Sequence, residues 1–201
     1  MNLDASGGHL GNVVRLRAPA RRPIASNGVI GMILFVVAET MFFAGLISAF
    51  TIVKTTAVGG WPPLGQPRLP VERTAVNTLA LLSSGPLLWL AARRFARGQP
   101  RVMQALLGAI GLGAFFVVFQ GAEWVALLAE GLTVRSSTHS GFFYLIVGAH
   151  GLHAVAALAG LFASARRLST GRLSPAFFST AQIFWYFVVA LWPVLYWRVY
   201  L

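Results

Sequence analysis

Five long apolar stretches follow one another along the chain, separated by short segments rich in Gly, Pro and Arg. Each stretch is close to, or longer than, the roughly 20 residues that an α-helix needs to cross the hydrocarbon core of a bilayer. The pattern therefore predicts an all-α, polytopic transmembrane bundle over residues 28–201, preceded by a basic tail over residues 1–27. The spans are expected at about residues 28–53, 75–93, 102–129, 140–165 and 176–199.

Composition and charge agree with a membrane protein. Of the 201 residues, 57% are hydrophobic and 10% are charged, whereas soluble domains carry about 25% charged residues. The net charge of +11 raises nucleic-acid binding as an alternative, but the basic residues cluster between the apolar stretches. Such clusters are typical of topology signals and lipid-headgroup contacts. Most lie in the tail and in the loops after the second and fourth spans, which predicts a cytoplasmic N-terminus and an outer C-terminus.

Several kinds of chemistry are excluded by missing residues and motifs. The chain has no Cys, so disulfides, thiolate catalysis, iron–sulfur clusters and a thiolate copper site are ruled out. The Gly-x-Ser-x-Gly, phosphate-loop and His-Glu-x-x-His motifs do not occur either. We therefore expect no catalytic, cofactor-binding or metal-binding residue in this chain, and we do not expect it to be an enzyme on its own.

Four ionisable residues interrupt the predicted spans: Glu39, Glu123, His150 and His153. A charge at mid-bilayer costs about 3 kcal/mol even on lenient insertion scales, so such residues usually face a partner, a cavity or another helix. They are the candidates for a role in proton transfer or lipid contact. Hydrogen bonding between helices is the structural alternative for each of them.

The two histidines lie three residues apart, which places both on one side of a helix. That spacing can bind a metal, but a full ligand set would need Glu39 or Glu123 from other helices. Haem ligation by a His pair generally takes the two imidazoles from opposing positions. We therefore expect His150 and His153 to hydrogen-bond to Glu39 or Glu123 instead.

Neutral polar and small residues predict contacts between the helices. Asn77, Ser84 and Gln120 are expected to form helix–helix hydrogen bonds. Small residues also recur every four positions, a spacing that lets helix backbones approach closely in lipid. These repeats are Ala109 with Gly113, and Ala156 with Gly160 and Ser164.

Most of the tryptophans fall near predicted span ends or in flanking loops, which is typical of anchoring at the membrane interface. These are Trp61, Trp89, Trp124, Trp192 and Trp197, and Tyr200 is expected to anchor the interface with them. Trp185, near the start of the fifth span, fits this pattern less well.

Taken together, the polar motifs resemble subunit III of haem–copper oxidases, the cytochrome c oxidase subunit 3 family. The matching segments occur in the family's order and run from about residue 28 to the end. They are residues 34–46, which contain Glu39; residues 76–84; residues 119–124, which contain Glu123; and residues 131–133, 140–144 and 148–153, which contain both histidines. Longer family members have seven spans, so the chain is most similar to the short five-span bacterial type.

The resemblance implies an accessory role in aerobic electron transport. Such a subunit is not itself catalytic. It packs against subunit I, which carries haem and copper, in a complex that also contains subunit II. It is expected to bind phospholipid, to support proton uptake by its partner and to stabilise the complex during turnover. The expected location is the bacterial inner, or cytoplasmic, membrane.

The resemblance also assigns residues. Glu39 matches the family's intramembrane carboxylate, and Glu123, His150 and His153 match its other buried polar positions. Near the C-terminus the family often has His and Asp where this chain has Tyr186 and Val189. The polar contacts of those two residues are therefore expected to be lost or replaced here.

Two other functions remain open at this stage. The accessory subunit of a nitric oxide reductase resembles this family and would share most of its motifs. A small proton-coupled transporter would use Glu39, Glu123 and His153 as a proton relay. Internal repeats or broken helices would favour a transporter, and the sequence contains no evident repeat.

Overall fold

The computed structural model describes residues 26–57, 61 and 69–200. In this part of the chain there are five long α-helices, a short π-helix at the C-terminus and no strand. Their bounds are α1 Asn27–Thr56, α2 Val71–Ala96, α3 Val102–Ala129, α4 Thr138–Ser169, α5 Pro175–Leu195 and η1 Tyr196–Tyr200. All five predicted helices are confirmed. The basic tail predicted over residues 1–27 lies outside the described residues, apart from its last two positions.

The helix ends follow from local chemistry. Ser137 caps α4, because its side-chain oxygen accepts a hydrogen bond from the backbone N–H of Ser140. In turn, the side-chain oxygen of Ser140 accepts a hydrogen bond from the backbone N–H of Ser137. Helix α5 begins with the cap Ser174 followed by Pro175, whose fixed φ suits the first helical turn. After α4 the chain turns at Gly171, which has a φ of +66° that favours glycine.

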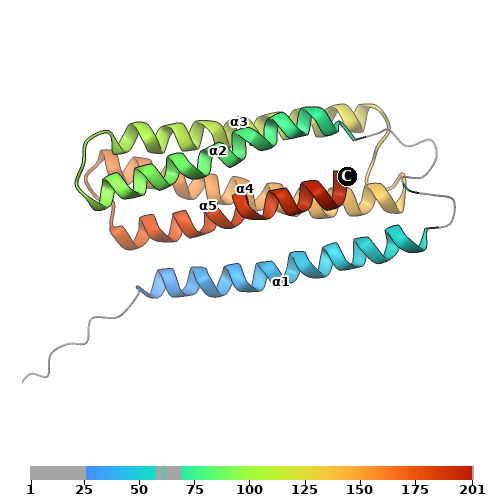
Figure 1. Cartoon of the computed structure of the whole chain (residues 1–201), viewed down its shortest axis with the longest axis horizontal. Coiled ribbons are helices and arrows are strands. Elements are labelled where there is room, and N and C mark those ends of the chain that lie inside the picture. Colours follow the sequence, from blue (N-terminus) through green and yellow to red (C-terminus); the bar gives the residue numbers. More distant parts are fainter. Residues whose placement is uncertain (1–25, 58–60, 62–68, 201) are drawn as a thin grey trace, which may run out of the picture.

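Each of the five helices is long and apolar enough to cross a membrane. The bundle is built around neighbours in sequence: α2 lies along α3, and α4 lies along both α3 and α5 (Figure 1). Helix α1 lies at the edge of the bundle and contacts α5 and α4. Only 6% of its most apolar stretch is buried, against 28–39% for the other helices. Most of the apolar surface of α1 is therefore left for lipid or for another protein.

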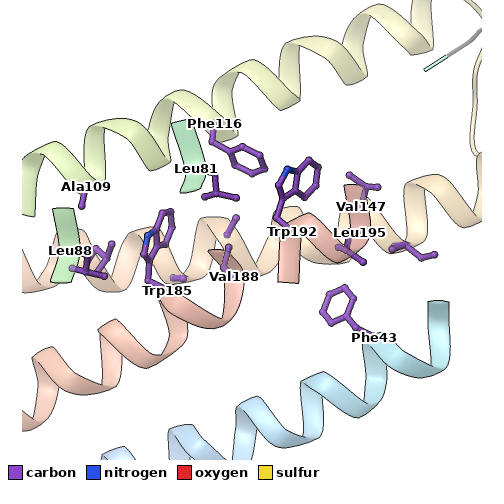
Figure 2. Close-up of a cluster of buried hydrophobic side chains, with 14 of the residues drawn as sticks. Phe43, Leu81, Leu88, Ala109, Phe116, Val147, Trp185, Val188, Trp192 and Leu195 are labelled. Atoms are coloured by element: carbon purple, nitrogen blue, oxygen red, sulfur yellow. The ribbon is translucent and has the colours of Figure 1, made fainter. Parts of the chain in front are cut away.

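The core between α2, α3 and α5 is organised by two tryptophans. Figure 2 shows Trp185 and Trp192 projecting from α5 toward α3, and both are fully buried. The prediction that Trp192 anchors the membrane interface is therefore wrong, because its ring packs edge-on against Phe116 inside the bundle. The poor fit of Trp185 to interfacial anchoring is explained in the same way. Trp89 and Trp197, by contrast, are more than half exposed.

The two predicted small-residue repeats have different outcomes. Ala109 is fully buried, and Gly113 lies against the Trp185 ring, so this repeat does allow close helix packing. In the second repeat Gly160 faces Ala181 of α5 and Ser164 is buried. Ala156 is exposed, however, so the prediction that it takes part in the same contact is wrong.

Candidate functional site

Glu39 of α1 and His153 of α4 contact each other at the outer side of the bundle. Glu39 Oε2 lies 3.1 Å from His153 Nε2, and the two side chains are 21% and 14% exposed. His153 Nδ1 lies 2.7 Å from the carbonyl oxygen of Ala149. Because a carbonyl only accepts, Nδ1 must carry a proton, and the other nitrogen is left to interact with the acid.

This tautomer fixes what the pair can do. If the imidazole is neutral, Nε2 is an acceptor and Glu39 must be a protonated acid that donates to it. If Nε2 carries the proton, Glu39 is a carboxylate that accepts it. The two forms differ only by the position of one proton between Oε2 and Nε2, and both have zero net charge. The arrangement can therefore hold or relay a proton without placing a net charge among the helices.

Four phenylalanines surround the imidazole of His153. Their ring centroids lie 5.5–6.2 Å from it, and two of them come from α1 and two from α5. They are Phe35, Phe43, Phe184 and Phe187. Such an apolar shell strengthens the electrostatic attraction within the pair because little solvent is present to screen it.

A second polar cluster joins α2, α3 and the C-terminal π-helix. Thr74 Oγ1 lies 3.0 Å from Glu123 Oε2, and the amide of Gln120 donates to the same carboxyl oxygen at 3.4 Å. Gln120 Nε2 also donates to the hydroxyl of Tyr200 at 3.0 Å, while Asn77 donates to Gln120 Oε1 at 3.4 Å. All five side chains are buried. The cluster therefore fixes the end of the chain to the α2–α3 pair.

Two further hydrogen bonds connect α5 to α2. The indole N–H of Trp185 donates to Ser84 Oγ at 3.0 Å, and that of Trp192 donates to Thr78 Oγ1 at 2.8 Å. Ser84 thus lies in an interhelical bond. Sequence reasoning missed Thr78 and Thr74, since a hydroxyl in a span often bonds only to its own helix. The prediction that Tyr200 anchors the membrane interface is wrong, because its side chain is buried in the polar cluster.

The two histidines diverge although they lie three residues apart. Three residues correspond to about 60° around a helix axis, which turns His153 toward α1 and leaves His150 facing α3 and α5. His150 is 1% exposed, and its ring lies 5.0 Å from that of Trp192. Neither of its nitrogens has a hydrogen-bond partner among the described residues. It therefore makes neither of the bonds to Glu39 or Glu123 that the sequence predicted.

The groups that could bind a metal are dispersed. In the described part of the chain, no three His, Asp or Glu side chains come together in a way that could hold an ion. Glu39 with His153, and Glu123 with Gln120, form separate clusters on different helices.

The two departures near the C-terminus also have structural consequences. The hydroxyl of Tyr186 is buried and has no partner among the described residues. Val189 lies against α2, where its Cγ1 is 3.7 Å from the place that a Cβ on Gly85 would occupy. The Val189 position thus makes an apolar contact between helices.

Five membrane-crossing helices with acids and imidazoles between them define a multi-pass helical membrane protein with two intramembrane polar clusters. Residues 21–201 match the family model described as cytochrome c oxidase subunit III. Relatives named cytochrome c oxidase subunit 3 agree: those of Mus musculus and Rattus norvegicus are each 34% identical over 188 residues, covering 89% of this chain and 71% of the relative. That of Halichoerus grypus is 32% identical over the same length. The chain belongs to the cytochrome c oxidase subunit III family.

Proposed function

We propose that the chain is a non-catalytic subunit III of a respiratory terminal oxidase of the cytochrome c oxidase type. In this role it packs on subunit I, in a complex with subunit II, in the inner membrane of a bacterium. Haem and copper reside in the partner subunits, and phospholipid lies along this chain. Its N-terminus faces the cytoplasm and its C-terminus the outside. Its contribution to electron transport is to shape proton uptake and to keep the complex stable during turnover.

The Glu39–His153 pair is the observation that supports this role most directly. An acid and an imidazole lie 3.1 Å apart among phenylalanine rings of α1 and α5. Removing two such groups from water costs several kcal/mol per charge. If their role were only to hold the helices together, apolar side chains would do so at a lower cost. A proton held between Oε2 and Nε2 at the side of the bundle is placed where a neighbouring subunit or a lipid headgroup can exchange it.

The edge position of α1 supports the lipid and partner contacts. Leu34 and Met41 are 65% and 71% exposed, and their spacing of about two turns places them on one face of α1. Such a continuous apolar face on a membrane helix is covered either by acyl chains or by another subunit. Glu39 lies on the other side of α1 from this face, where it meets His153 of α4.

Copurification tests the assignment. An affinity tag on this chain should recover a haem-containing complex from solubilised membranes, with haem absorbance in the visible spectrum and a larger His-rich partner. Copper analysis of the same preparation separates an oxidase from the nitric oxide reductase alternative. A colourless, solitary chain would overturn the proposal. Solute flux through that isolated chain in liposomes would then favour the transporter alternative.

The variant Glu39→Gln tests the role of the pair within the complex. Gln can still donate to His153 Nε2 through its amide, so the subunit should remain in the purified oxidase. It cannot exchange a proton, so proton uptake or the turnover lifetime should fall. The matched control is Glu130→Gln, which neutralises an exposed acid at the end of α3 and should change neither. Loss of the subunit from the complex would show that Glu39 is purely structural.

A further inference from the structure

A cavity of about 340 Å³ lies between α3 and α4, and Gln120 of the second polar cluster forms part of its wall. Its lining is largely apolar and includes Val117, Leu152 and Val155. Leu152 and Val155 are 70% and 50% exposed, so the cavity opens on the outer surface of the bundle. Because α3 and α4 are membrane spans, this mouth faces hydrocarbon. A molecule that enters must come from the bilayer.

Trp124 forms one wall of the cavity, in an arrangement that depends on glycines of α4. A Cβ on Gly151 would lie 3.2 Å from the Trp124 ring, and one on Gly148 would lie 3.8 Å away. The indole thus lies across α4 where side chains are absent. Its Nε1–H is buried and has no acceptor among the described residues. An indole N–H can only donate, so it calls for an acceptor.

His150 lines the same cavity and has two more buried atoms without hydrogen-bond partners. It lines the cavity and is 1% exposed, and both of its ring nitrogens lack partners in the described part of the chain. A neutral imidazole offers one donor and one acceptor. Its ring is held between aromatic neighbours, 5.0 Å from Trp192 and 6.2 Å from Phe116 between centroids. Leaving such groups unpaired is unfavourable, and a ligand that pairs with them regains part of that cost.

We propose that this cavity binds the ring of an isoprenoid quinone. A quinone ring is flat and uncharged, and its carbonyl oxygens accept hydrogen bonds from the Trp124 N–H and from an imidazole N–H of His150. The faces of Phe116, Trp124 and Trp192 suit a planar ring. The isoprenoid tail leaves through the apolar mouth at Leu152 and Val155.

The lining argues against the main membrane alternative. A saturated acyl chain has no acceptor along its length for the Trp124 N–H. A phospholipid headgroup brings charge, whereas none of the described residues that line the cavity is Arg, Lys, Asp or Glu. The proposal concerns binding only, and it holds whether or not the partner subunits are those of an oxidase.

Photolabelling of the full chain in its native membranes tests the site. The probe is an azido-benzoquinone with a short isoprenoid tail, and labelled peptides are identified by mass spectrometry. Label is expected on peptides of α3 or α4 that line the cavity. An excess of unlabelled short-tail ubiquinone should displace it, and an equal excess of dioleoyl phosphatidylcholine should not. Absence of label on these peptides, or equal displacement by phospholipid, overturns the proposal.

Two variants with matched controls localise the signal. Trp124→Phe removes only the N–H and should lower the labelling about five-fold, the worth of one buried hydrogen bond. Val155→Trp fills the mouth without touching the polar atoms and should also abolish most labelling. The controls are Trp89→Phe and Val76→Trp, which change lipid-exposed positions on α2 and should leave labelling unchanged. Unchanged labelling in both cavity variants would contradict the assignment.

Discussion

The six-membered ring of Trp185 occupies the space in which a side chain on Gly113 would have to lie. A Cβ built on Gly113 overlaps the far edge of the indole, and it would also lie 3.2 Å from Leu158 Cδ1. The Trp185 ring is fully buried, and its N–H is held by Ser84, so the ring cannot move aside without losing that bond. Gly113 is therefore the place on α3 where the Trp185 ring of α5 packs. Figure 2 shows this ring extending from α5 toward α3.

Gly113→Ala should destabilise the protein by about 1–3 kcal/mol, the usual cost of overpacking a filled core. The free energy of unfolding can be measured as the loss of helical circular dichroism when the detergent-solubilised chain is titrated with SDS. Gly111→Ala is the matched control, because nothing lies within 4 Å of a Cβ at that position of the same helix. Equal stability of the two variants would show that α5 does not pack as described.

Ser84→Ala should cost about 1–3 kcal/mol, because it leaves the indole N–H of Trp185 buried without an acceptor. The adjacent change Ser83→Ala controls for the loss of a hydroxyl from a helix. Ser83 is exposed and donates only to Leu79 of its own helix. It should alter the free energy of unfolding by less than about 0.5 kcal/mol. A comparable loss in both variants would mean that the interhelical bond adds nothing.

Glu39→Leu and His153→Leu should each destabilise the chain, by about 1–3 kcal/mol, because each leaves the other polar group among phenylalanines without its partner. The double variant places two apolar side chains together and should recover most of that loss. A double-mutant cycle on the free energy of unfolding measures this non-additivity. Simple addition of the two single losses would show that the pair is not coupled.

Tyr200→Phe should cost about 1 kcal/mol, since the amide of Gln120 loses its shorter hydrogen-bond acceptor. Tyr186→Phe is the matched control. Its buried hydroxyl has no partner among the described residues, so removing it should leave the free energy of unfolding of the isolated chain unchanged or raise it slightly. The same two variants measured in the complex would reveal whether a partner subunit engages the Tyr186 hydroxyl. A loss of stability for Tyr186→Phe in the isolated chain would contradict this expectation.

The membrane spans could be predicted because hydropathy is a local property of the sequence. Helix ends deviate by several residues where hydrogen bonding continues into polar turns. Helix α2 begins at Val71, not near residue 75, because its first turn carries Glu72 and Arg73. The π-helix after Leu195 was not predicted at all. Pro193, which lacks an N–H, is the one local signal that the α-helical ladder is weakened there.

The partners of the polar residues could be predicted only in part. The cost of burial marks Glu39 and Glu123 from sequence alone, but their partners depend on which helices become neighbours. From the sequence alone, either His150 or His153 could pair with either acid. The rotation of about 60° between them gives His153 to α1 and leaves His150 among aromatic rings. The wrong position predicted for Trp192 has a related cause. Nearness to a span end indicates the depth of a residue in the membrane, but it does not indicate whether its side of the helix faces lipid or the other helices.

The position of α1 has a consequence for how the chain is made. Synthesis proceeds from the N-terminus, so α1 enters the bilayer before α4, which carries the imidazole that meets Glu39. During that interval Glu39 has no His153 to pair with, and α1 cannot dock on α4 or α5. Packing of α1 against α4 and α5 is then a late assembly step, and the Glu39–His153 contact stabilises the packed state. A ribosome-bound chain truncated before α4 should leave Glu39 open to chemical modification that the finished protein resists.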